Sequence, residues 1–135
     1  MTEARNPLAT MLGTYYPTHY VVAAFPDPAR ASQALAALRA AGLAAAAALC
    51  PGPDFLRNYR DFVAHRNLLQ RAEGLFPSEE QAAVEEYLAA AERGASFVTV
   101  HAPRPAERER AREVLRAAGG EALRYYGDHA ITDLP

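Results

Sequence analysis

The chain has 135 residues and a formal net charge of −2, and all of its positive side-chain charge comes from arginine. This length fits a single domain that buries a core without disulfides or a structural metal. The negative net charge argues against a nucleic-acid partner, because binding one requires a basic face on the protein. The single cysteine, Cys50, excludes an internal disulfide and suits a cytoplasmic location.

The N-terminal residues show no hydrophobic period, so we expect a partly ordered arm over 1–17. They also lack a charged segment followed by a long apolar run, which predicts no secretory signal. The longest apolar stretch, 43–50, is far too short to span a bilayer, so no membrane partner is expected. The remaining residues, 18–135, are predicted to form one domain.

A strand followed by a helix opens this domain. Residues 19–25 (HYVVAAF) are β-branched and aromatic and stop at Pro26, which predicts a buried strand. Asp27 and Pro28 then suit the cap and the first turn of a helix. Gly42 is placed to end that helix in a left-handed turn.

The alanine-rich residues 43–50 fit two interpretations. Alanine favours helix, but the glycine stop before this segment and Pro51 after it leave too little room for one, so we predict a strand. Two helices are expected in the link that follows. One covers about 54–72 and has aromatic residues at helical spacing, and one covers 78–93 and opens with a Ser-x-x-Gln capping box.

The second half repeats the order of strand, helix and strand. Residues 96–101 (SFVTVH) predict a strand, and Pro103 and Pro105 break it and start a helix. Gly119 and Gly120 are predicted to end that helix. The last strand is predicted over 122–126, with a continuation to Ile131.

An offset of 77 residues (103 minus 26) superimposes the two halves without a gap. Pro26 falls on Pro103, and residues 38–42 are identical to residues 115–119. Chance matching in a chain rich in alanine and arginine is the alternative explanation. Two such β-α-β units need a shared sheet to bury the apolar stripes of their helices.

We therefore predict an α+β, ferredoxin-like fold made of duplicated β-α-β units. Its four-stranded sheet would carry helices on one face. The first half lies at 19–50, a helical insert at 54–93, and the second half at 96–131. Helix 54–72 must then pack at an edge or an end of the sheet, or across its open face.

Several of these segments resemble the 17M-type general stress proteins of bacteria. The resemblance is carried by Phe25-Pro26-Asp27 with the alanines that lead to Gly42, by 87–94, by Ser96-Phe97-Val98-Thr99-Val100, and by Arg124-Tyr125-Tyr126-Gly127. It covers roughly 19–127, and the long helix at 54–72 departs from the pattern. The resemblance implies a ferredoxin-like module of unassigned biochemistry, associated with general stress, and it supplies no catalytic residues.

Side-chain alternation predicts an aromatic face on the sheet. Phe97 and His101 share one side of their strand, Tyr20 is equivalent to Phe97 in the repeat, and one of the two last tyrosines joins them. The candidate ligand or interface residues are Tyr20, Phe97, His101, Tyr125 and Tyr126. Such a face needs a cover in water: another subunit, the chain's own arm or helix 54–72, or a small ligand.

No cofactor, metal or catalytic residue is predicted. The chain has no His-x₃-His or Cys-x-x-Cys spacing among its histidines and Cys50, namely His19, His65, His101 and His129. It also has no nucleophile motif and no phosphate-binding glycine loop. Aromatic residues on a sheet can stack on RNA bases, but that interpretation requires a basic balance.

Two hypotheses about function follow. The favoured one is a non-enzymatic interaction module, stress-associated, that acts as a homo-oligomer, most simply a homodimer, through its open sheet face. The alternative is a small-molecule- or haem-binding ferredoxin-like barrel protein or enzyme, which only the histidines and tyrosines support.

Overall fold

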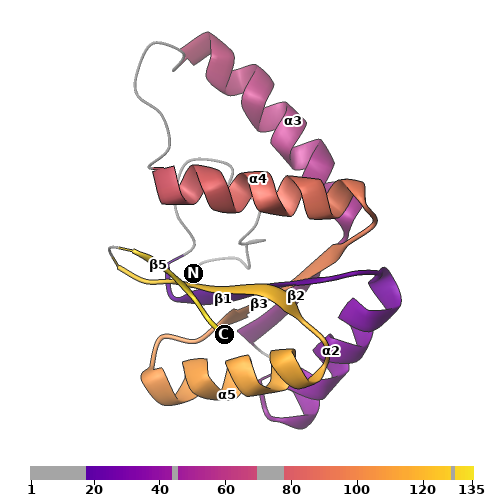
Figure 1. Ribbon diagram of the computed structural model, residues 1–135, viewed down its shortest axis with the longest axis vertical. Coiled ribbons are helices and arrows are strands. Elements are labelled where there is room, and N and C mark those ends of the chain that lie inside the picture. The colour runs from indigo at the N-terminus through magenta and orange to yellow at the C-terminus, as the bar shows by residue number, and fades with distance from the viewer. Residues whose placement is uncertain (1–17, 44–45, 70–77, 129) are drawn as a thin grey trace, which may run out of the picture.

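A computed structural model describes residues 18–43, 46–69, 78–128 and 130–135, with the backbone alone over 61–69 and 78–81. The expected N-terminal arm, 1–17, lies outside the described residues. In the described part the chain is a mixed α+β structure, an open antiparallel sheet with helices packed against it (Figure 1).

The sheet of the described residues has five strands where the sequence predicts four. Every neighbouring pair is antiparallel, and the order across the sheet is β2 (Ala47–Cys50), β3 (Ser96–His101), β1 (Tyr20–Phe25), β4 (Glu121–Tyr126) and β5 (Ile131–Asp133). The fifth strand arises because the backbone N–H of Gly127 donates to the carbonyl of Ala130 at 2.9 Å. This turn reverses the chain, so that Ile131 pairs with Tyr126 instead of extending β4.

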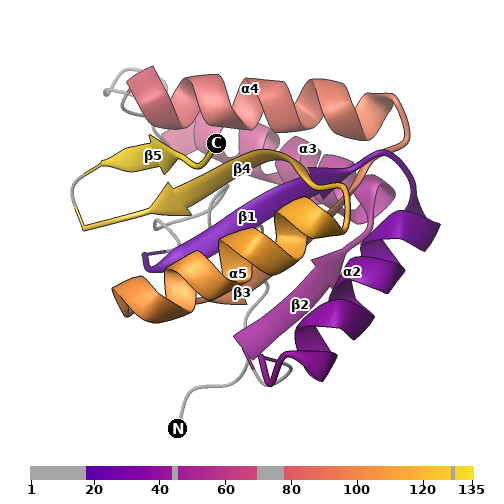
Figure 2. The ribbon, with the colours of Figure 1, turned by 60° about the horizontal axis from the view of Figure 1, so that its bottom comes forward.

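The first face of the sheet is covered by α2 (Pro28–Ala40) and α5 (Pro105–Ala117), as Figure 2 shows. Asp27 caps α2 as predicted, since its Oδ1 accepts from the N–H of Arg30 at 2.8 Å. Gly42 ends the turn after α2 with φ at +84°, a backbone conformation that costs L residues energy. The apolar stripes of both helices pack on alternate strand residues, including Val21, Ala23, Phe25, Val98, Val100 and Leu123.

The second face of the sheet is covered as well, so the expectation of helices on one face is wrong. Figure 1 shows α4 (Ser78–Glu92) lying across this face and α3 (Gly52–Leu69) leaning away from it beyond its first turns. The strand residues on this side include Val22, Ala24 and Phe97, and leaving these apolar side chains in water would cost free energy. The buried residues of this second core include Val22, Ala24, Cys50, Phe55, Val84, Tyr87, Phe97 and Tyr126.

Helix α3 begins two residues earlier than predicted and starts in direct contact with the sheet. The carbonyl of Pro51 accepts from the N–H of Phe55 at 3.1 Å, which closes the first turn. Gly52 donates to the Oγ of Ser96 at 3.4 Å, and a Cβ at Gly52 would stand 2.1 Å from the carbonyl oxygen of Ala95. The helix therefore leaves the sheet through a point at which only glycine fits.

Candidate functional site

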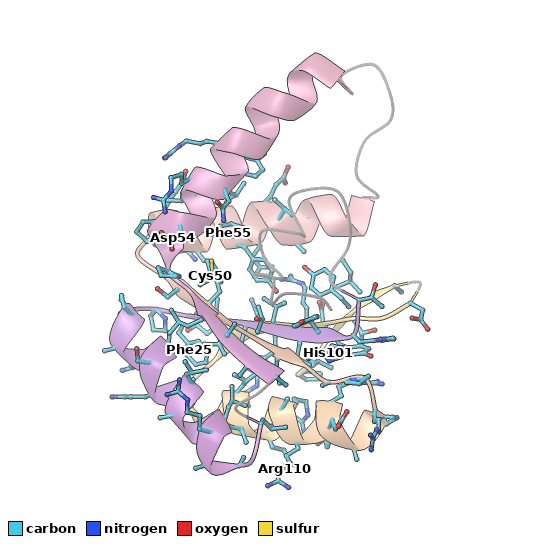
Figure 3. All side chains as sticks on the ribbon, turned by 180° about the vertical axis from the view of Figure 1, so that it is seen from behind. Phe25, Cys50, Asp54, Phe55, His101 and Arg110 are labelled. Carbon is cyan, nitrogen blue, oxygen red and sulfur yellow. The ribbon has the colours of Figure 1, made fainter. Side chains whose placement is uncertain are left out.

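Tyr20 and His101 form the accessible part of the predicted aromatic set. They face each other in the antiparallel register of β1 and β3, and their ring centroids lie 5.0 Å apart. His101 is exposed and Tyr20 is half-buried. Figure 3 shows His101 at the end of the sheet away from Phe55 and Cys50, where α3 starts.

Phe97 and Tyr126 are buried inside the second core instead of lying on an open face. Neither side chain has any exposed surface. The ring centroid of Phe97 lies 5.0 Å from that of Phe55 and 5.5 Å from that of Tyr87, distances typical of packed aromatic pairs. These two residues therefore hold α3 and α4 on the sheet and are not available to a partner.

Tyr125 points to the opposite face from Tyr126, because neighbouring strand residues alternate. It belongs to the first core, with the guanidinium carbon of Arg108 4.0 Å from its ring centroid and the ring of His19 stacked at 6.5 Å. The five predicted residues consequently do not form one site. The structure brings together Tyr20 and His101 alone as an accessible pair.

The outer edge of the sheet next to this pair was not predicted from the sequence. Strand β2 pairs with β3 on one side and with no described strand on the other, and Figure 2 shows it at the margin of the sheet. Ala48 is exposed, and alternation places it on the second face beside Cys50. Residues 43–53 carry no charge. No local signal in the sequence identifies this strand as an edge, because natural edge strands usually carry charge.

The opposite edge of the sheet, formed by β5, is guarded by charge. Asp133 is exposed, and its Oδ1 lies 3.2 Å from the Nε of Arg124. Arg124 also pairs with Glu86 of α4. The carbonyl of Leu134 accepts from Arg116 at 2.7 Å. Charges and short length are the usual means by which proteins protect such an edge, and β2 lacks the charges.

The arginine on β4 also borders an open cavity of about 310 Å³. The lining combines guanidinium and carboxylate groups with backbone and aliphatic atoms, from Glu86, Arg116, Ala122, Leu123, Arg124, Asp133, Leu134 and Pro135. Both signs of charge meet in it, so it suits a small polar molecule better than an apolar cofactor.

Tyr87 connects α4 to β4 beneath this cavity. Its hydroxyl donates to the carbonyl of Ala122 at 3.1 Å, and the guanidinium carbon of Arg124 lies 5.3 Å from its ring centroid. Burial raises the pKa of Tyr87 to about 12, although the hydrogen bond with Arg124 acts in the other direction. The folded state therefore favours the neutral phenol.

This pKa makes stability depend on alkaline pH. An unfolded tyrosine ionises near pH 10, so the contribution of neutral Tyr87 is complete below that pH and is lost as pH rises towards 12. We expect Tyr87→Phe to be less stable than the parent by about 1 kcal/mol at pH 8, because one hydrogen bond is missing. That deficit should shrink and then reverse as pH rises above 10, at about 1.4 kcal/mol per pH unit. Urea unfolding from pH 8 to 11.5 measures both curves, and parallel curves would contradict the assignment.

The two histidine side chains that the structure describes make different contacts. The Nε2 of His19 is 3.0 Å from the Oδ1 of Asp128, whereas His101 contacts Tyr20. No group of three potential metal ligands occurs within the described ranges. The side chain of His65 and all of His129 lie outside what the structure describes.

These features of the sheet edge and of the Tyr20–His101 pair suit recognition by shape and by strand pairing.

No described helix is both long and apolar enough to cross a membrane. Comparisons with protein-family models, with curated proteins and with solved structures found no match to this chain.

Proposed function

We propose that the protein is a non-enzymatic interaction module that self-associates as a homodimer. The observation that carries this proposal is the aromatic corner, defined as Tyr20, Ala48 and His101 on the second face of the sheet. Its alanine and histidine are exposed, and its two rings contact each other. Aromatic groups of this kind are enriched where protein surfaces meet.

The proposal includes a ferredoxin-like origin for the fold. In support, α2 and α5 have the same length and their bounds, Pro28–Ala40 and Pro105–Ala117, differ by the repeat offset of 77 residues (105 minus 28). The order β2-β3-β1-β4 with antiparallel neighbours is what two interleaved β-α-β units produce. A stress-associated role rests on the sequence resemblance alone.

Light scattering coupled to size-exclusion chromatography tests self-association. We expect the parent to elute with twice the mass of one chain at micromolar concentration. The double variant Tyr20→Ser, His101→Ser should shift towards monomer, because it removes both rings of the corner while leaving the two cores intact. Its matched control is Arg110→Ser, an exposed site on α5 at the other face (Figure 3). A parent that remains monomeric would contradict the proposal.

A second candidate function is the binding of a small molecule, favoured by the cavity beside Arg124. Its mixed charges suit a zwitterion or a small acid. A thermal-shift screen with amino acids, small dicarboxylates, flavins and haem tests this candidate, with Arg116→Gln as the variant that removes one lining charge. Absence of a shift with every compound would leave it without support.

A further inference from the structure

We propose that two copies of the chain join edge to edge through β2, as an antiparallel pair that continues the sheet across a two-fold axis. This inference rests on the proposed self-association and names the surface that performs it. The dimer would contain one continuous sheet with a β2 strand from each copy at its centre.

The capacity to bind a partner follows from the hydrogen-bonding groups of an edge strand. Alternate N–H and C=O groups of β2 face away from β3, and a second strand can pair with them in place of water. Natural edges avoid pairing through short length, charge, proline within the strand or bulges. Strand β2 is short, but it has none of the other three protections. The two prolines that follow, Pro51 and Pro53, lie beyond its end.

Two-fold symmetry requires one residue of β2 to lie at the axis, and exposure indicates which one. Antiparallel partners that face each other point to the same side of a sheet, so a strand that pairs with its own copy must place one residue opposite itself. Ala48 is exposed, whereas Leu49 packs on the first core. We assign Ala48 to the axis, where a methyl side chain permits close approach of the two copies.

One observation and one geometric consequence of the pairing favour a second copy over an unrelated strand. The stretch 43–53 is uncharged, so pairing with itself brings no like charges together. An axis perpendicular to the sheet also keeps the second faces of both copies on the same side. The aromatic corner of each copy, with Tyr20 on β1 opposite His101 on β3, then lies on the same surface as its counterpart.

Opposite charges placed at the axis provide the test. Ala48→Lys and Ala48→Glu should each weaken self-association by at least about tenfold, because each variant sets two like charges against each other. Mixing the two variants in equal amounts should restore a dimer that contains one of each. Thr132→Lys, an exposed site on the opposite edge strand β5, is the matched control and should leave the parent's mass unchanged.

Amide hydrogen exchange of the parent is the second measurement, and it needs no variant to fold. Protection of residues 47–50 should rise with protein concentration, while that of 131–133 should not. If the parent is dimeric but both Ala48 variants remain dimeric and residues 47–50 exchange independently of concentration, the β2 interface is wrong and self-association stands. A parent that is monomeric at every concentration overturns both proposals.

Discussion

Phe97→Ala is expected to lower the free energy of unfolding by about 3 to 5 kcal/mol. The side chain has no exposed surface and its ring lies between those of Phe55 and Tyr87. Removing it leaves a cavity among buried side chains from the sheet, α3 and α4, so the surroundings can relax only in part. Chemical unfolding followed by far-ultraviolet circular dichroism measures the loss.

Tyr20→Ala is the matched control, because Tyr20 holds the equivalent position in the repeat but is half-buried at the aromatic corner. Its loss of stability should be about 1 kcal/mol. The difference between the two variants measures how well α3 and α4 cover the second face. Equal costs would mean that this face is as open as the sequence pattern suggests, and would contradict the described packing.

Gly52→Ala should destabilise the protein by about 3 kcal/mol, at the upper end of the cost of overpacking. The added Cβ would stand 2.1 Å from the carbonyl oxygen of Ala95, which is backbone and cannot rotate away. The start of α3 must then move off the sheet, which would weaken the contact of Gly52 with Ser96 and the burial of Phe55. Chemical unfolding gives the cost, and faster amide exchange in residues 52–60 would locate it.

Gly42→Ala separates this steric effect from the usual cost of replacing a glycine. Gly42 has φ at +84° and no atom within 4 Å of an added Cβ, so the substitution should cost about 1 to 2 kcal/mol from backbone strain alone. It should leave exchange in α3 unchanged. Should Gly52→Ala prove no worse than Gly42→Ala, the close approach of α3 to the sheet would be disproved.

Local chemistry explains which elements the sequence could predict. The cap at Asp27 and the two prolines around the start of α5, Pro103 and Pro105, act over a few residues, so the bounds of α2, β3 and α5 follow from them closely. The prediction from the sequence leaves the cover of the second face open between another subunit, the chain's own arm or helix 54–72, and a small ligand, and helix α4 is not among these. Yet β1 is apolar in both of its alternating sets, from Val21 to Phe25, and that is typical of a strand buried on two sides.

The candidate site was harder to predict, since it depends on long-range placement. The choice between Tyr125 and Tyr126 depends on register, and the pairing of β4 with β1 shifts between Val22 and Ala24. The exposure of His101 depends on where α4 lies. Which strand forms an outer edge is a property of sheet order, and no local pattern in the sequence encodes it.

The pairing of Cys50 with Phe97 makes everything between β2 and β3 an enlarged hairpin connection. Both α3 and α4, which cover the second face of the sheet, belong to this one continuous stretch of sequence. The two ends of the stretch are neighbours in space. The entropy of closing such a connection rises only slowly with its length. A related chain could therefore have a longer, shorter or different connection between β2 and β3 while keeping the rest of the sheet. Another element would then have to cover the second face of the sheet.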